Sequence, residues 1–308
     1  MTQATLADTN TGNVRMTAGE RAGIPPRRMD FEFSEETNRY WYGNSAFLTT
    51  FWTTLSSLFP EGETFFVDSV KNYRGIINDP LLKAQVSGFI GQEAMHSKEH
   101  EAFNNMAAKH GFPADKLDKE LGVMLRFVRK VLPKKMQLAA TVALEHYTAI
   151  LAEQLLRDER HQQMIKDPEA LKLWMWHALE ENEHKIVAYD VYQLAGGGYF
   201  LRTFVMLITT VLFFAIVGVN HARLLWADKS LFKFKDNWKG ITFLWGWKGL
   251  FPQLAGKYLD FFRPGFHPND HDTVALLDEW RHKMLDEGGM LADQIKNPSS
   301  AAKSTAAA

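Results

Sequence analysis

The chain has 308 residues, of which 46% are hydrophobic and 23% are charged, a composition typical of a folded globular protein. Its formal net charge of -1 gives no overall attraction to polyanions, so we expect no nucleic-acid partner. Cysteine is absent, which excludes disulfides, thiolate nucleophiles and iron–sulfur clusters and leaves only nitrogen and oxygen ligands for any metal. The first residues contain no apolar run of the secretory-signal kind, and we expect a cytoplasmic protein.

Four regions are predicted along the chain. Residues 1–28 are small and polar, which predicts a disordered N-terminal arm. Residues 29–195 have helical periodicity and are predicted to form a helical bundle. Residues 196–296 are predicted to add an apolar helix and further aromatic and basic helices packed on the bundle. The low-complexity residues 297–308 are predicted to form a disordered tail.

The helices of the bundle are predicted from their start and stop signals. Asp79-Pro80 and Asp167-Pro168 each place an N-capping acid before a proline in the first helical turn, and three consecutive glycines at 196–198 are a strong stop. The predicted core helices cover 60–78, 80–109, 133–160 and 168–194, with a further helix at 115–131 in a connection. No alternating run indicates a strand, so the predicted fold class is all-α, a four-helix bundle with additional C-terminal helices.

The inward stripe of each core helix is apolar except near its middle, where Glu and His interrupt it. A buried, unpaired carboxylate costs several kcal/mol or shifts its pKa until it is neutral. Four such helices would therefore make a poor core unless metal ions bind the carboxylates and imidazoles. The predicted ligands, in chain order, are Glu63, Glu93, His96, Glu145, His177, Glu181 and His184.

The spacing of these residues supports a two-metal site. In Glu93-x-x-His96 and Glu181-x-x-His184 the partners are three residues apart, so both side chains leave the same face of the helix. Ferritin-like di-iron bundles use one Glu from each of two helices and a Glu-x-x-His pair from each of the other two, as here. Nitrogen and oxygen ligands suit iron or manganese. We expect two Fe ions, with Mn as the alternative.

The heights of the predicted ligands along the helices also agree. In an antiparallel hairpin, residues at one height are equally far from the turn. Glu63 and the Glu93/His96 pair have their midpoint near 79, at a predicted helix boundary, while Glu145 and Glu181 have theirs at 163, inside a polar loop. The alternative interpretation of these residues is a structural network of ion pairs.

Further polar residues lie near the stripe. His177 precedes Glu181 by one turn and is predicted to be a seventh ligand, the alternative being a core histidine bonded to a neighbour. His100, one turn beyond His96, and Tyr73 are predicted to hydrogen-bond or pack against the ligands without binding the metals, the alternative for His100 being a further ligand. A solvated or supporting position is expected for the flanking residues Gln92, Glu99, Glu180 and Glu183.

Two segments resemble known proteins. FPEGETFFVDSVKNYRGIINDPLLKAQVSGFIGQEAMHSKEH and WHALEENEHK resemble a bacterial family known as predicted metal-dependent hydrolases, over about residues 27–270. The seven-position pattern is similar, in motif and order only, to that of p-aminobenzoate N-oxygenase, a ferritin-like di-iron enzyme. That similarity implies a centre that activates O2.

The predicted function is that of a di-iron oxygenase or oxidase, which would use O2 and an electron donor to act on a small, fairly apolar organic substrate. A dinuclear metal-dependent hydrolase is the rival enzyme, and iron or peroxide handling is the non-enzymatic alternative. Storage ferritins are compact four-helix shells, so about a hundred residues after the last core helix argue against storage.

One apolar segment indicates contact with a membrane. Residues 203–219 carry no charge, and this run is at the short limit of a membrane span. The stretch 226–247 then interleaves lysines with aromatic residues, as at a membrane–water interface. We expect peripheral contact of 203–247 with the inner face of a membrane. The alternatives are a buried fifth helix or the face of a homodimer.

Overall fold

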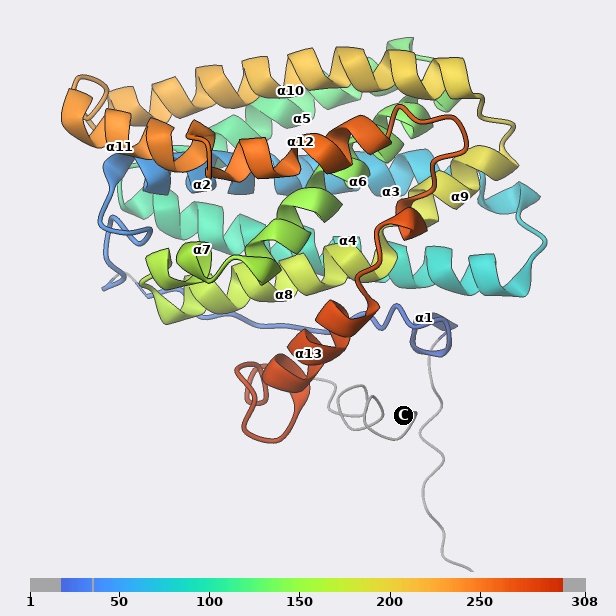
Figure 1. Cartoon of the computed structure of the whole chain (residues 1–308), viewed down its shortest axis with the longest axis horizontal. Helices are drawn as coiled ribbons and strands as arrows, with labels where there is room; N and C mark the ends of the chain where they lie inside the picture. Colours follow the sequence, from blue (N-terminus) through green and yellow to red (C-terminus); the bar gives the residue numbers. More distant parts are fainter. Residues whose placement is uncertain (1–17, 35, 296–308) are drawn as a thin grey trace, which may run out of the picture.

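The protein is helical, and its computed structural model describes residues 18–34 and 36–295 (Figure 1). Within these residues there is no strand, and one isolated bridge pairs Tyr42 with Ile165. The predicted all-α fold class is therefore confirmed. The predicted tail 297–308 and residues 1–17 of the predicted arm lie outside the described residues.

Four helices pack around the centre of the molecule. They are α3 (Phe59–Lys71), α4 (Pro80–Lys109), α6 (Lys134–Arg157) and α8 (Pro168–His184). Helix α3 packs on α4 and α6 on α8, while contacts between α3 and α6 and between α4 and α8 join the two pairs. The connecting helix α5 (Ala114–Val131) lies against α3 and α4.

The predicted caps are present, but several boundaries differ. Asp79 and Asp167 accept hydrogen bonds from backbone N–H groups at the starts of α4 and α8. The helix predicted at 60–78 ends at Lys71 and is followed by the short η1 (Arg74–Ile76), because Gly75 and its neighbours favour a helix weakly. The predicted loop at 160–166 contains most of α7 (Glu159–Met164).

The helix predicted at 168–194 is two helices. It divides at Lys185 into α8 and α9 (Val187–Leu194). The Lys185 ammonium donates hydrogen bonds to the carbonyl of His271 and the hydroxyl of Thr273, which ties this break to the C-terminal segment. Since these bonds join residues far apart in sequence, local periodicity could not show the break.

Helix α2 (Ala46–Ser56) was not predicted, and every one of its residues is buried. A helix buried on all sides has no polar face, so its sequence AFLTTFWTTLS lacks the periodic signal of an amphipathic helix. Two of its four threonines satisfy their hydroxyls within the helix, since Thr50 and Thr54 donate to carbonyls four residues earlier. The only local signal is Ser45, which caps the N-terminus.

The C-terminal helices cover one side of the four central helices (Figure 1). Helix α10 (Tyr199–Ala227) packs along α6 and α2, and α11 (Phe234–Trp245) and α12 (Leu250–Asp260) follow it. Helix α13 (Val274–Leu285) packs on α8, on another side of the molecule. Among the described residues, α10 alone is long and apolar enough to cross a membrane.

The described part of the predicted N-terminal arm is folded rather than disordered. Helix α1 (Ala18–Arg21) packs on α4, and the chain then runs along that helix with Arg27 fully buried. Two glycines of α4 make this close approach possible. A Cβ at Gly88 would lie 2.4 Å from the carbonyl oxygen of Ile24, and one at Gly91 would lie 2.6 Å from Pro26. Residues 18–28 were predicted to be disordered because their composition is polar, and their long-range contacts leave no local signal.

Candidate metal centre

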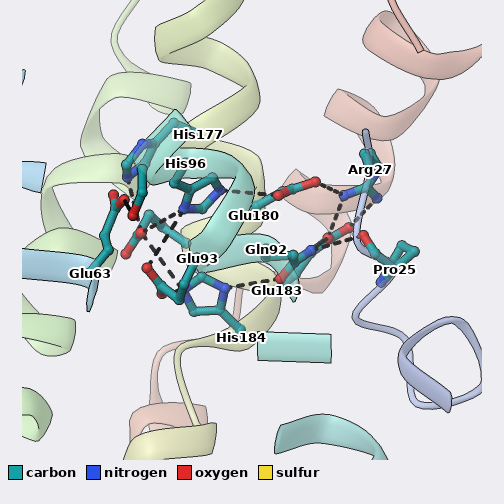
Figure 2. A network of polar contacts seen from close by, with 12 residues as sticks. Pro25, Arg27, Glu63, Gln92, Glu93, His96, His177, Glu180, Glu183 and His184 are labelled. Atoms are coloured by element: carbon teal, nitrogen blue, oxygen red, sulfur yellow. Dashed lines mark hydrogen bonds and ion pairs between the residues drawn. The ribbon is translucent and has the colours of Figure 1, made fainter. Parts of the chain in front are cut away.

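The seven predicted ligands converge in the interior between the central helices, and all are buried. Helix α3 supplies Glu63, α4 supplies Glu93 and His96, α6 supplies Glu145, and α8 supplies His177, Glu181 and His184. Figure 2 shows carboxylates and imidazoles from different helices pointing toward one another. The seven residues therefore lie at matching heights along the helices, as the predicted hairpins require.

Six of the seven side chains form two adjacent groups of three. Glu63, His96 and His177 each offer a ligand atom within 4.8 Å of the others, and Glu93, Glu181 and His184 do the same. Glu145 adjoins the second group, since its carboxylate lies 3.6 Å from Nε2 of His184. The groups are neighbours, because the Glu181 carboxylate lies 3.0 Å from His177 Nε2 and 3.6 Å from His96 Nδ1. Two groups of this size have the arrangement expected for two metal ions.

Many polar atoms of the cluster have no hydrogen-bond partner among the described residues. They include both carboxylate oxygens of Glu93 and of Glu145, and one ring nitrogen of each of the three histidines. His184 Nε2 lies 3.1 Å from Glu93, but without the geometry of a hydrogen bond. Buried polar atoms are nearly always paired. A group of unpaired oxygen and nitrogen atoms that face one centre therefore fits bound cations better than it fits a network of ion pairs.

The pKa values of the carboxylates show the same need for positive charge. Burial, reinforced by repulsion from Glu93, raises the pKa of Glu63 and of Glu145 well above the usual value. Burial also raises the pKa of Glu93 itself. Burial would raise the pKa of Glu181 too, but its contacts with His177 and His184 outweigh burial and hold it well below the usual range. Two divalent cations would balance four carboxylates.

Each histidine of the cluster is held through its second ring nitrogen. His96 Nε2 lies 3.0 Å from Glu180, His177 Nδ1 lies 2.8 Å from His100 Nε2, and His184 Nδ1 lies 2.9 Å from the Gln92 side-chain oxygen. The nitrogens left over are those that face the carboxylates. Such outer partners fix the orientation of metal-binding histidines and their tautomer, and here they are preformed.

Arg27 connects two of these outer partners, and sequence reasoning missed it. Its guanidinium donates to Glu180 and to both oxygens of Glu183, each at 2.8 Å (Figure 2). Glu183 in turn accepts a hydrogen bond from Gln92, the residue behind His184. Burial raises the pKa of Glu180 to about 8, and the charge of Arg27 opposes that rise. Nothing local could have signalled this role for a residue of the polar arm.

The two other residues predicted to support the ligands lie in different places. His100 is behind His177, as expected, and its Nδ1 lies 2.8 Å from the hydroxyl of Ser56 on α2. Tyr73 lies beyond the end of α3 and packs against the apolar cluster that includes Val70. Within the described residues, no hydrogen bond, ion pair or ring contact joins Tyr73 to the seven residues of the centre, and its supporting role stays a prediction.

An apolar pocket of about 260 Å³ opens onto the cluster. Glu63, His177 and Glu181 line one part of it. The rest of the lining comes almost entirely from apolar side chains of α2, α3, α5, α6 and α10, with Trp174 beside the cluster. Any ligand that reaches the carboxylates through this pocket would therefore be surrounded by hydrocarbon.

These features define an all-α protein whose buried Glu and His groups could bind metal. The chain belongs to the family described as predicted metal-dependent hydrolase, whose family model matches residues 25–272. The matched region contains all seven residues of the centre, and it also contains Arg27. No curated protein and no solved structure matches the chain.

Proposed function

We propose that the chain is a ferritin-like dinuclear metal enzyme that uses O2 to oxidise an apolar organic substrate. The observation that carries this proposal is the position of the seven-residue Glu/His cluster at one end of an apolar pocket. The metal is iron in this proposal, with manganese as the alternative, because the ligands offer only oxygen and nitrogen. Bound ions would supply the site at which O2 is activated.

The residues of the chain have separate tasks in this proposal. Glu93, Glu145 and His184 would hold the metals on the side away from the pocket, while Glu63, His177 and Glu181 would hold them where the pocket lining reaches the centre. The apolar lining binds the substrate and excludes water from the reaction. An electron donor from outside the chain would complete an oxygenase cycle.

A metal-dependent hydrolase is the second candidate, and the family description favours it. Two metals can activate water for attack on an ester, amide or phosphate. Such a reaction builds negative charge on a substrate oxygen and usually needs hydrogen-bond donors placed around it. The pocket is lined mainly by aliphatic and aromatic carbon, which suits a hydrocarbon group better than a developing oxyanion.

One experiment separates the two reactions. The apo protein is loaded with Fe(II) under argon, then given O2 and a reductant while oxygen uptake is followed. In parallel, hydrolysis of chromogenic esters is measured under argon with Fe, Mn or Zn bound. We expect oxygen uptake by the iron-loaded protein and none by a Glu93→Ala variant. The oxygenase proposal would be refuted if the zinc-loaded protein hydrolysed esters without O2 as fast as the iron-loaded protein does.

A further inference from the structure

The outer side of α10 is an exposed apolar surface. Its exposed residues recur every three or four positions, so they form one continuous stripe along the helix. The large members of the stripe are Phe200, Phe204, Leu207, Ile208, Val211, Leu212, Val219 and Trp226. Val211, near the middle, is 69% exposed. A monomeric soluble protein rarely exposes a contiguous apolar surface of this kind without a function for it.

Neighbouring helices extend the surface. On α11, Phe234, Trp238 and Trp245 are exposed at helical spacing. Ring contacts connect this helix to α10, because Phe232 lies 6.3 Å from both Trp226 and Phe234. On α5, Val123, Phe127 and Val131 are exposed in the same way. We call the outer sides of α5, α10 and α11 the apolar face.

The pocket of the metal centre opens on the apolar face. Met124 of α5 and Ile208 and Leu212 of α10 line the pocket, and all three are exposed. They therefore mark a mouth between α5 and α10. An ion pair between Arg223 of α10 and Glu120 of α5 joins the two helices beyond the mouth. A hydrophobic molecule could pass from the apolar face to the Glu/His cluster without crossing a polar surface.

Unpaired positive charge accompanies the apolar face at the α11 end. Residues 229–248 contain five lysines, at 229, 233, 235, 239 and 248, all exposed. Within the described residues, none of them has an ion pair with a carboxylate. The nearby acids are turned inward, since Asp228 accepts from Arg39 and Asp236 accepts from Ser45. Exposed lysines beside aromatic side chains suit the anionic headgroups of a phospholipid bilayer.

We propose that the apolar face lies on an anionic lipid bilayer and that the pocket takes a long-chain lipid substrate directly from that bilayer through the mouth between α5 and α10. The second half of this proposal rests on the proposed function, and the first half does not. Helix α10 packs along α6 and α2, so it lies flat on the protein and the contact is peripheral. A second copy of the chain is a weaker occupant, because this end of the face offers lysines and no free acids to pair with them.

Vesicle flotation tests the membrane half. The protein is mixed with vesicles of phosphatidylcholine containing phosphatidylglycerol, and with vesicles of phosphatidylcholine alone. We expect flotation with the anionic vesicles that weakens as salt is added. Val211→Glu should reduce binding by roughly tenfold or more, and Lys235→Glu with Lys239→Glu should do the same for anionic vesicles only. Val274→Glu, a matched change at a 67% exposed residue of α13, should change nothing.

A fluorescent fatty acid, cis-parinaric acid, tests the pocket half without any turnover. Wild type and Val211→Glu should bind it equally, while Ile208→Trp, which narrows the mouth, should weaken its binding with metal content unchanged. Concentration-dependent dimers without vesicle binding would overturn the membrane half in favour of a second copy. Vesicle binding without uptake of the fatty acid would overturn the pocket half. Oxygen uptake by the iron-loaded protein is measured separately. Its absence, with vesicle and fatty-acid binding intact, would contradict the proposed function and leave the binding results standing.

Discussion

Substitution of His177 distinguishes its two possible roles, because a metal ligand and a core packing residue would respond differently. Its ring lies between His100, which contacts Nδ1, and Glu181, which lies near Nε2. We expect His177→Ala to lower the bound metal from about two ions per chain to about one, while the helices stay folded. Metal analysis and circular dichroism on the same sample measure both effects.

His221→Ala is the matched control, because His221 is also buried but is held by the Phe47 carbonyl and the Thr50 hydroxyl, away from the cluster. It should lower the melting temperature and leave metal content unchanged. If His177→Ala behaves like this control, the packing role is the correct one.

Within the described part of the chain, Arg27 reaches the centre through Glu180 and Glu183. Arg27→Met keeps most of the side-chain volume but leaves buried Glu180 without its cation and Glu183 with Arg281 alone, which costs about 3–5 kcal/mol of stability. Because His96 and His184 lose firm outer partners, metal affinity should also fall, by roughly 10- to 100-fold. Urea unfolding and competition with a metal chelator measure the two losses.

Arg39→Met provides the comparison, since Arg39 pairs with Asp228 outside the centre. It should reduce stability without changing metal affinity. Unaltered affinity in Arg27→Met as well would show that the chain of contacts from Arg27 does not reach the metals.

For single helices, the accuracy of the predicted boundaries depended on whether the signals that set them lie within the helix or in distant segments. Helix α4 has the predicted boundaries because a proline, an acidic cap and a periodic stripe all lie within its own sequence. The placing of His177, Glu181 and His184 on one face of α8 needed only helical geometry. Helix α2 was missed because burial on every side removes the polar face, and the break at Lys185 was missed because its cause lies near residue 271.

Helix α7 contains a buried histidine whose titration is open to measurement. His161 is 1% exposed, its Nδ1 lies 2.6 Å from the Tyr42 hydroxyl, and burial lowers its pKa to about 4. The unfolded chain has a histidine pKa near 6.5, so it takes up the proton first. The stability contributed by neutral His161 is therefore complete above about pH 6.5 and is lost as the pH falls toward about 4.

His161→Asn retains an acceptor for Tyr42 but cannot titrate. Between pH 7 and pH 4.5, the wild type should lose about 2 kcal/mol more unfolding free energy than this variant, with chelator present in both cases. Urea titrations at the two pH values measure the difference. Equal losses would mean that His161 is protonated in the folded state without cost.

At the scale of the whole molecule, the sequence predicted the centre better than its surroundings. The seven residues could be predicted because each helix repeats the same spacing and the hairpins set their heights. The arm that carries Arg27 and the pocket beneath α10 depend on which segments meet in space, and no periodicity records that. Whether the seven residues bind metal is still a prediction, and the charge balance of the folded chain gives the sharpest test of it.

Two glutamates of α6 should respond to substitution in opposite ways in the metal-free protein. The pKa of Glu145 is raised by burial and by Glu93, so its ionised form destabilises the fold increasingly as the pH rises above about 4.5. Burial would also raise the pKa of Glu153, but bonds from Lys257 and Arg157 outweigh it and lower that pKa, so ionised Glu153 stabilises the fold above the same pH. One helix thus carries a destabilising and a stabilising carboxylate.

With chelator at pH 8, Glu145→Gln should therefore melt about 3 °C or more above the wild type, the shift that roughly 1 kcal/mol produces in a protein of this size. Glu153→Gln should melt below the wild type. At pH 5 the advantage of Glu145→Gln should shrink, because the wild-type carboxyl then takes up a proton. With iron added, the order of Glu145→Gln and wild type should reverse, since metal that binds the native state adds stability by mass action and the variant has lost a ligand. If iron leaves the wild-type melt unchanged and Glu145→Gln melts lower than wild type at pH 8, the glutamates belong to a structural ion-pair network and the metal centre is refuted.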